Sequence, residues 1–310
     1  MLRTTLRTTA LTTTLYLLAS SLAVAADCDR IGNDAVEIGQ IIAAGDTKSA
    51  VKQAEKLAER EVDCVEAQLL LATTLNARLD MVGGLKALSV SKKYRRAIAA
   101  ALDIDPDNVD ARTEEIGYLI AAPSIAGGSR EKAAVRIAEL RTIDPLAAAQ
   151  MQLSLSRSGN DPDAVISSLQ TLVNMAHSDY GPRSELARRL ILAGRTDEAD
   201  RELSSWAPDL SPDAWVVLEH QYLRAATRVY GGFELDIAEA LLRQFIEARG
   251  HLDHPRLPSI AKANALIGST YEGRGDFDKA SDAYQATLRD DPDNRRAQDG
   301  LARISERRGE

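Results

Sequence analysis

Aromatic residues make up only 4% of this chain of 310 residues, which also contains just two cysteines and four histidines. Stretches in which β-branched and polar residues alternate, the pattern of half-buried strands, do not stand out. Alanine and leucine are abundant instead, so we expect an all-α protein. The shortage of histidine and cysteine leaves little material for a zinc site or a thiol nucleophile.

Catalytic and ligand-binding motifs are also missing. We find no Ser-His-Asp order, no Cys-His pair, no nucleophile elbow and no glycine-rich loop ending in Gly-Lys-Ser/Thr. His251, Asp253 and His254 are three potential metal ligands close together, but they lie in a proline-flanked linker, and no second cluster completes a tetrahedral site. We therefore predict no catalytic residue, no metal, no cofactor and no enzyme activity.

The first 25 residues have the pattern of a secretory signal peptide. Arg3 and Arg7 come first, an apolar run covers 15–24, and Ala23-Val24-Ala25 has the small-x-small form of a cleavage site. The run is short and the segment is rich in threonine, so it is a poor membrane span, although an uncleaved anchor remains the alternative. We expect a mature chain, 26–310, without a transmembrane span.

Removal of this segment would leave a more acidic protein. The formal net charge of −8 would become −10, because the segment contains two arginines and no acidic residue. An acidic surface argues against nonspecific binding of nucleic acid.

The stretch 261–294 has a length of 34 residues, the period of a two-helix repeat. Its first half places Ile267, Gly268 and Tyr271 on one helical face, and Gly275-Asp276 then breaks the helix. The second half carries an apolar stripe with Ala280, Tyr284 and Leu288, and Pro292 ends it. Such a pair exposes an apolar face that only stacked neighbours can bury.

These residues resemble the tetratricopeptide repeat family, whose pattern runs from Leu-Gly through Tyr, Ala and Phe to Pro. Asn264 departs from it, because the family often has Trp there. Weaker matches precede this repeat along the chain. The resemblance implies one right-handed α-solenoid over 26–310, with about seven helix pairs and a capping helix. The expected repeats are 30–62, 65–107, 109–145, 146–177, 181–208, 211–250 and 258–294, with the cap at 295–308.

Glycine pairs occur between the two helices of three repeats, at Gly83-Gly84, Gly127-Gly128 and Gly231-Gly232. They could form a docking edge rich in free backbone groups, or an anion site where Gly128-Ser129 opens a helix. We favour tight turns, with Ser129 capping the helix that follows.

The two cysteines flank the first expected helix pair. Cys28 comes just before its first helix and Cys64 just after its second, and those two points are neighbours in an antiparallel pair. Because export leads to an oxidising compartment, we predict a disulfide, with two buried thiols as the alternative. The bridge would contribute about 3–4 kcal/mol by restricting the unfolded chain.

In the tetratricopeptide family the first helix of each repeat lines a concave groove that usually holds an extended peptide or a partner's helix. Of the Lys/Asn/Arg clamp by which some members grip a C-terminal carboxylate, only Lys262 is matched. An ordinary hydrated groove is the alternative to a binding site. Carried over residue by residue, the groove positions are Glu66, Thr73, Asn76, Glu114, Tyr118, Arg188, His220, Thr227, Lys262, Ser269 and Glu272.

Taken together, these features predict a monomeric, exported scaffold that binds a protein or peptide partner. The segment 122–133 looks like one found in exported bacterial tetratricopeptide proteins of unassigned role, which implies a periplasmic or secreted location in a bacterium. One alternative is a hydrolase or carbohydrate-active enzyme on a helical array, for which no carboxylate pair is evident. The other is a self-associating envelope subunit, against which the charged final helix argues.

Overall fold

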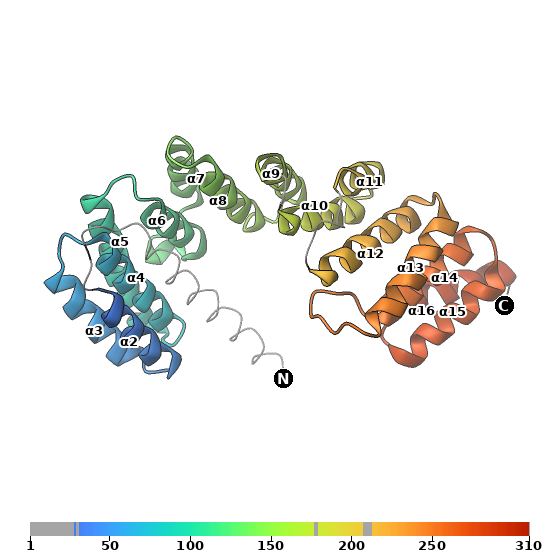
Figure 1. Ribbon diagram of the computed structural model, residues 1–310, viewed down its shortest axis with the longest axis horizontal. Helices are drawn as coiled ribbons and strands as arrows, with labels where there is room; N and C mark the ends of the chain where they lie inside the picture. The colour runs from blue at the N-terminus through green and yellow to red at the C-terminus, as the bar shows by residue number, and fades with distance from the viewer. Residues whose placement is uncertain (1–27, 29–30, 177–178, 207–212, 310) are drawn as a thin grey trace. The chain divides into compact units, whose positions relative to one another are not determined.

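The computed structural model describes residue 28 and residues 31–176, 179–206 and 213–309. All regular secondary structure in these ranges is helical (Figure 1), and successive helices pack against one another within each half of the chain. The prediction of an all-α solenoid is therefore confirmed. The expected signal peptide, 1–25, lies outside the described residues. Contacts divide the chain into two compact units, Met1–Asn160 and Asp161–Glu310.

The first unit contains three helix pairs and the first helix of a fourth. The first helices of neighbouring pairs contact each other at α2 with α4 and at α6 with α8, as stacked repeats require. In chain order the elements are α2 (Ile31–Ala43), α3 (Thr47–Arg60), α4 (Val65–Leu79), α5 (Gly84–Ile104), α6 (Val109–Ala121), the 3-10 helix η2 (Ser124–Ala126), α7 (Arg130–Leu140) and α8 (Pro145–Arg157).

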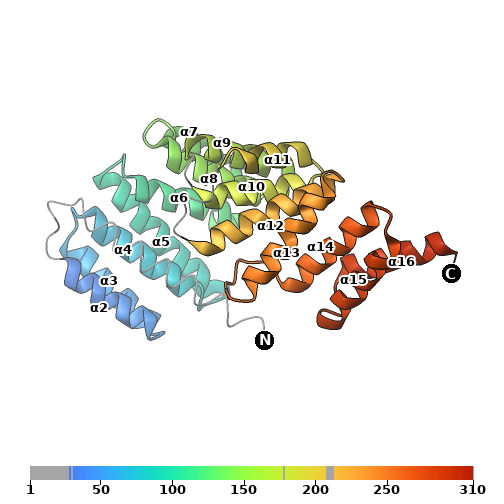
Figure 2. The same cartoon turned by 45° about the vertical axis from the view of Figure 1, so that its right-hand side comes forward.

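The second unit continues the alternation and ends in a cap. Helices α10, α12, α14 and α16 contact each other in succession, so α16 packs where the first helix of a further repeat would lie (Figure 2). The elements are α9 (Pro162–Met175), α10 (Tyr180–Leu192), α11 (Thr196–Ser204), α12 (Ala214–Gly231), α13 (Leu235–Arg249), α14 (Ile260–Gly273), α15 (Phe277–Asp290) and α16 (Arg295–Arg308).

Local sequence explains where many helices end and begin. Gly45 and Gly275 have φ values of 85° and 80°, in the left-handed region that glycine adopts without strain. The aspartates that follow cap the next helices, because Asp46 accepts a hydrogen bond from the amide of Ser49 and Asp276 from that of Lys279. The Gly-Asp break identified in the sequence is therefore a paired stop and start signal.

In five of the repeats, the fourth residue of the second helix is an alanine that is completely buried. A side chain this small allows the two helices to pack closely. These residues are Ala50, Ala133, Ala199, Ala238 and Ala280. Of the helices described, none is both long and apolar enough to cross a membrane.

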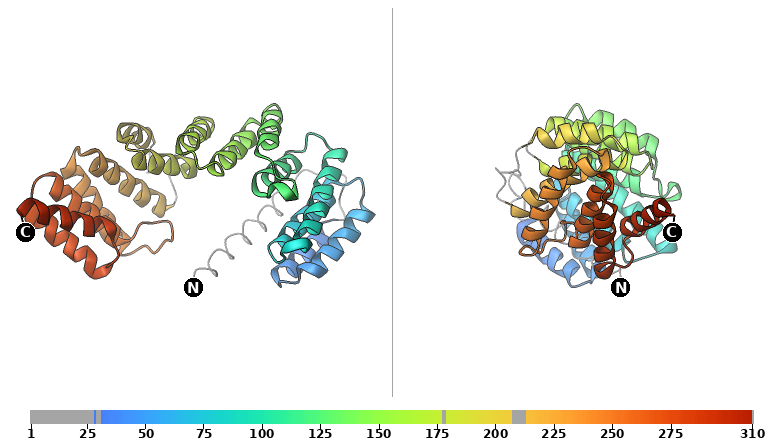
Figure 3. Two further views of the ribbon diagram at one scale, coloured as in Figure 1. Left: turned by 180° about the vertical axis from the view of Figure 1, so that it is seen from behind. Right: turned by 90° about the vertical axis from the view of Figure 1, so that its right-hand side faces the viewer.

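Two repeats in the first unit are longer than the family period, and the structure shows where the extra residues go. In the second repeat they lengthen α5, which begins at Gly84 and has 21 residues. Figure 3 shows the first unit from behind, with its early helices in blue to cyan. In the third repeat the segment Pro123–Gly128 forms η2 and its turns between α6 and α7. This insertion shapes the surface hollow described below.

Candidate functional site

Helix α4 carries three of the predicted groove residues, and they lie in different surroundings. Asn76 is exposed, Thr73 is half-buried, and Glu66 lies beside the cysteine bridge near the start of the helix. They do not converge on one site.

On α6, the predicted residues Glu114 and Tyr118 make hydrogen bonds within the fold. Glu114 accepts a hydrogen bond of 2.5 Å from the phenol of Tyr94, whose ring centre lies 5.2 Å from that of Tyr118. Burial raises the pKa of Tyr94, and the Glu114 carboxylate raises it further, so the phenol keeps its proton. Tyr118 donates a hydrogen bond of 2.6 Å to the carbonyl of Ala126 in η2.

Among the predicted residues on α10 and α12, only Arg188 reaches solvent, and it forms an ion pair with the buried Glu219. His220 is 4% exposed and Thr227 is fully buried. A ring nitrogen of His220 lies 2.8 Å from the carbonyl oxygen of Leu203, and the Thr227 hydroxyl donates to the carbonyl of Leu223. Burial leaves neither side chain a surface on which a partner could dock, which is at odds with the prediction for these two positions.

On α14 the capping helix engages two of the three predicted residues. Arg303 of α16 donates two hydrogen bonds of 2.8 Å to Glu272 and thereby lowers the pKa of this carboxyl. Arg296 of α16 donates to the hydroxyl of Ser269. Lys262 remains exposed. The first-helix positions of this repeat are thus contacts for α16.

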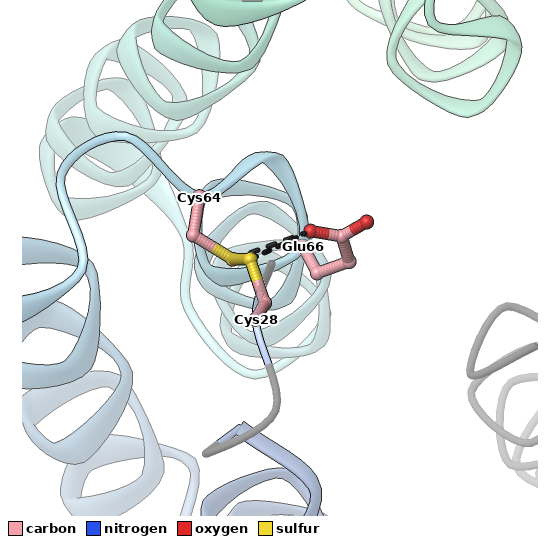
Figure 4. A group of neighbouring side chains, drawn as sticks. All are labelled: Cys28, Cys64 and Glu66. Carbon is pink, nitrogen blue, oxygen red and sulfur yellow. Dashed lines mark hydrogen bonds between the residues drawn. A yellow bond between two sulfur atoms is a disulfide. The ribbon is translucent and has the colours of Figure 1, made fainter. Parts of the chain in front are cut away.

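The predicted disulfide between Cys28 and Cys64 is confirmed, with a Cα–Cα distance of 6.3 Å. Oε2 of Glu66 lies 3.2 Å from both sulfur atoms (Figure 4). Bonded sulfurs have no proton to donate, so this contact places a carboxylate directly against the bridge. The same three residues are grouped closely enough to hold a metal ion, but the bridge consumes both thiolate ligands.

A surface hollow in the first unit has a volume of about 870 Å³. Residues of α5, α6 and α7 line it, together with Gly127 next to η2; we call the lining residues of α6 and the apolar ones of α5 its floor, and the charged ones of α5 and α7 its walls. We call it the α5–α7 hollow. Its volume is within the range of sites that hold a small ligand or a short stretch of peptide.

Apart from Glu115, the floor of the α5–α7 hollow is apolar. It includes Ile98 and Leu102 of α5 and Tyr118 and Leu119 of α6, and Ile98 is only 3% exposed. Val135 of α7 also lines the hollow and is 58% exposed. An apolar group that entered here would remove exposed hydrocarbon from water.

The walls are basic, although the protein as a whole is acidic. Lys92, Arg95 and Arg96 project from α5, and Lys132 and Arg136 from α7. Three carboxylates also line the hollow, so the cations are in excess; these are Asp103, Glu115 and Glu131.

Two of the five cations are already engaged. Nε of Arg136 lies 3.2 Å from Glu115, and its guanidinium also pairs with Glu139. Both contacts raise the pKa of Arg136, and the hydrogen bond to Glu139 contributes most. Nη1 of Arg95 lies 3.4 Å from the carbonyl oxygen of Ala126.

The other three cations, Lys92, Arg96 and Lys132, form no ion pair with any residue in the described ranges. Lys92 and Arg96 come from α5 and Lys132 from α7, and all three line the hollow together with its apolar residues. The arrangement can therefore hold a ligand that is apolar at its centre and anionic at its edges.

Of the predicted residues, only Tyr118 lines this hollow. The sequence interpretation missed its cations because it followed the first helices, whereas the walls come from second helices of two successive repeats. The basic run Lys92-Lys93-Tyr94-Arg95-Arg96 was a visible signal. The glycine pair Gly127-Gly128 does lie at this site, as part of the turn that follows η2.

The histidines of the 251–258 linker do not assemble a ligand set. His251 is exposed, and Asp253 pairs with Arg249 at 3.3 Å. The ring of His254 stacks on Trp215 with centres 4.7 Å apart, and Nδ1 of His254 accepts a hydrogen bond from the amide of Arg256. The linker is thereby attached to α12.

No protein-family model matches the chain, and no curated protein matches it. Among solved structures, it is similar to the C-terminal part of a TPR repeat-containing protein from Cytophaga hutchinsonii. The TM-score is 0.59 at 15% identity, over 86% of this chain and 99% of that one. The chain therefore has the tetratricopeptide-repeat fold that the sequence predicted.

Two further solved structures are similar over comparable lengths, at TM-scores below 0.5. A tetratricopeptide repeat protein from Parabacteroides merdae has 15% identity and a TM-score of 0.42, covering 88% of this chain and 99% of that one. PilW, a type IV pilus biogenesis factor, has 14% identity and a TM-score of 0.41, with the same coverage.

Proposed function

We propose that this helical-repeat chain is an exported scaffold that holds a segment of a partner protein in the α5–α7 hollow. The hollow itself is the observation that carries the proposal. It combines an open volume of about 870 Å³, an apolar floor, and cations on both walls that have no partner within the described chain. An apolar centre with a polar rim is the usual anatomy of a protein interface.

The chemistry of the lining supports binding rather than catalysis. Among the described side chains that line the hollow there is no histidine or cysteine, and the only hydroxyl is that of Tyr118. Glu115, a carboxylate on its floor, is paired with Arg136. General acid–base chemistry needs a titratable group within reach of the substrate and poised near the working pH, and none is evident here.

Export is supported by two independent features. The first 25 residues have the order of charge, apolar run and small residues that a signal peptide requires. The Cys28–Cys64 disulfide is a bond that persists in oxidising compartments. We place the mature protein, as a monomer, in the periplasm or outside a bacterial cell. Mass spectrometry of the purified protein would test this, since export predicts an N-terminus near Ala26.

A photo-crosslinking side chain at Val135 tests the proposed binding site. Val135 lines the hollow, whereas the neighbouring Ala134 is also exposed on α7 but does not line it. In the native organism, we expect the probe at position 135 to capture one discrete protein, and the probe at 134 to capture none. Identical capture from both positions, or from neither, would refute the hollow as the binding site.

The predicted groove residues that remain accessible offer a second test. Arg188, Lys262 and Tyr118 are all predicted groove residues, but only Tyr118 lines the hollow, and its hydroxyl also donates a hydrogen bond to Ala126 of η2. The pair Arg188→Ala and Lys262→Ala should therefore be compared with Tyr118→Phe, which removes only the phenol oxygen. If the α5–α7 hollow holds the partner, only Tyr118→Phe should weaken its capture.

A further inference from the structure

A second, smaller hollow lies on the other side of α5. It has a volume of about 230 Å³ and is lined by residues of α3, α4 and α5; we call it the α3–α5 hollow. Four of its lining side chains are cationic, Lys48, Arg78, Lys86 and Lys93, and none is acidic. Two basic hollows therefore flank a single helix in a protein of net charge −8.

The two hollows adjoin each other along α5. The consecutive residues Lys92 and Lys93 line different hollows, Lys92 the larger and Lys93 the smaller. Residues three or four apart are neighbours on a helix surface, so Ser89 of the smaller hollow adjoins Lys92 and Lys93 adjoins Arg96. Basic residues of both hollows therefore adjoin each other on α5, where Lys93 also forms an ion pair of 2.6 Å with Glu55 of α3.

We infer that these two hollows together bind an acidic, extended segment of a partner protein, with an aliphatic side chain on the floor of the α5–α7 hollow. The inference rests on the proposed function, because it specifies the segment that the scaffold holds. Carboxylates on either side of the aliphatic residue would face Lys92 and Arg96 on one wall and Lys132 on the other. Charge complementarity of this kind fixes orientation and speeds association.

The distribution of the charges favours a chain segment over a membrane surface. The cations come from two helices, α5 and α7, and line a hollow that also contains Ile98 and Leu119, so a chain segment that enters the hollow can meet both the cations and the apolar residues. A planar array of lipid headgroups would instead meet the side chains that protrude furthest, such as Leu85 of α5 and Ile125 of η2, which are 85% and 82% exposed.

Fluorescence anisotropy with the mature chain tests the inference. The probe is a labelled short peptide of Glu and Asp with a central Leu, and two comparison peptides carry Ser at the centre or Lys in place of the acids. The variant K92Q/R96Q/K132Q removes the three unpaired cations. A matched control, K52Q/K56Q/R141Q, removes three exposed cations of the same unit that line neither hollow. Circular dichroism establishes that both variants are folded.

We expect the Leu-centred peptide to bind the mature chain and the control equally and the hollow variant at least tenfold more weakly. The Ser-centred peptide should bind more weakly than the Leu-centred one, and the Lys peptide should not bind. Binding should weaken with added salt, since the cations are solvent-exposed. Equal loss in both variants, or no preference for acidic peptide, would overturn the inference.

Two further results separate this inference from the proposed function. If crosslinking at Val135 captures a partner whose bound segment is not acidic, the scaffold function holds and the acidic specificity fails. If vesicles of phosphatidylglycerol bind with the same dependence on Lys92, Arg96 and Lys132 while the peptide does not, the ligand is a lipid surface, and the inference fails.

Discussion

Gly268 of α14 leaves the space that the ring of Tyr284 on α15 occupies. A Cβ atom at position 268 would lie 2.5 Å from Cε1 of this ring, and one at Gly300 of α16 would meet the ring on its other edge. Tyr284 is fully buried between the three helices, and its hydroxyl donates a hydrogen bond of 2.8 Å to Glu272. The aromatic ring thus joins the last repeat to the capping helix.

Gly268→Ala should destabilise the second unit by about 1–3 kcal/mol, the usual cost of overfilling a packed core. Both tryptophans, Trp206 and Trp215, belong to this unit, so its unfolding in urea can be followed by fluorescence, and that of the first unit, which contains Gly117, by circular dichroism. Gly117 is the matched control, since it follows an isoleucine in α6 just as Gly268 does in α14. A Cβ atom at Gly117 would meet nothing within 4 Å. Gly117→Ala should therefore stabilise its helix by up to ~1 kcal/mol. If Gly117→Ala and Gly268→Ala both lowered the free energy of unfolding by similar amounts, the packing of Tyr284 against Gly268 would be contradicted.

The glycine pairs are predicted to differ in their tolerance of alanine. A Cβ atom at Gly128 would collide with the backbone carbonyl of Ala122, so Gly128→Ala must open the turn after η2. We expect a loss of about 2 kcal/mol or more and weaker binding in the α5–α7 hollow. At Gly83 the backbone is extended, with φ of −136°, and the space around a Cβ atom is empty. Gly83→Ala should change the free energy of unfolding by less than about 0.5 kcal/mol. If the two substitutions lowered the free energy of unfolding equally, the contact between Gly128 and the carbonyl of Ala122 would not explain the loss.

Reduction of the Cys28–Cys64 bridge should lower the thermal midpoint of the first unit. The bridge closes a loop with a sequence separation of 36 residues and restricts the unfolded chain, which corresponds to about 3–4 kcal/mol. Calorimetry with and without reductant measures the shift. The Cys28→Ser variant should show the lower midpoint under both conditions. Equal midpoints for the oxidised and reduced protein would mean that the bridge adds no stability.

Glu66 should slow the reduction of this bridge. Thiolates attack disulfides as anions, and the Glu66 carboxylate lies 3.2 Å from both sulfurs, so it repels the approaching reagent. A repulsion of about 1 kcal/mol would slow the reaction roughly fivefold. Glu66→Gln should therefore be reduced faster by an anionic thiol such as glutathione, and Glu59→Gln, an exposed charge change on α3, should not. The difference should shrink in high salt.

Low pH should weaken the contact between α13 and α14 at Glu239. Burial alone would raise the pKa of this carboxyl, but hydrogen bonds from Tyr271, Arg274 and Arg243 outweigh it and lower the pKa from 4.5 to about 2. Because the folded-state pKa is depressed, the ionised carboxylate stabilises the fold above pH 4.5, and this contribution is lost as the pH falls towards 2. Glu239→Gln should thus be less stable than the wild type near neutral pH. The gap in urea unfolding should close as the pH is lowered through this window; a gap that persists at pH 2 would refute the assignment.

Features that depend on neighbouring residues were visible in the sequence. The Gly-Asp breaks at Gly45 and Gly275 could be located because a left-handed glycine and a capping aspartate act within one helical turn. The Cys28–Cys64 pair followed from the antiparallel geometry of a single helix pair. The small residue at Gly268 and the ring of Tyr284 were likewise recognisable as parts of one repeat.

Features that depend on several repeats were decided by the tertiary structure. The sequence placed His220 and Thr227 in an open groove, but packing against neighbouring helices buries them, since a small rotation of a helix exchanges its inner and outer faces. The α5–α7 hollow needs Lys92 and Lys132 from second helices of different repeats, held apart by an insertion that follows no repeat pattern. The periodicity of the sequence determined where the helices lie and how first and second helices alternate. Which side chains meet on one surface was decided only by the length of each helix and by its packing against its neighbours.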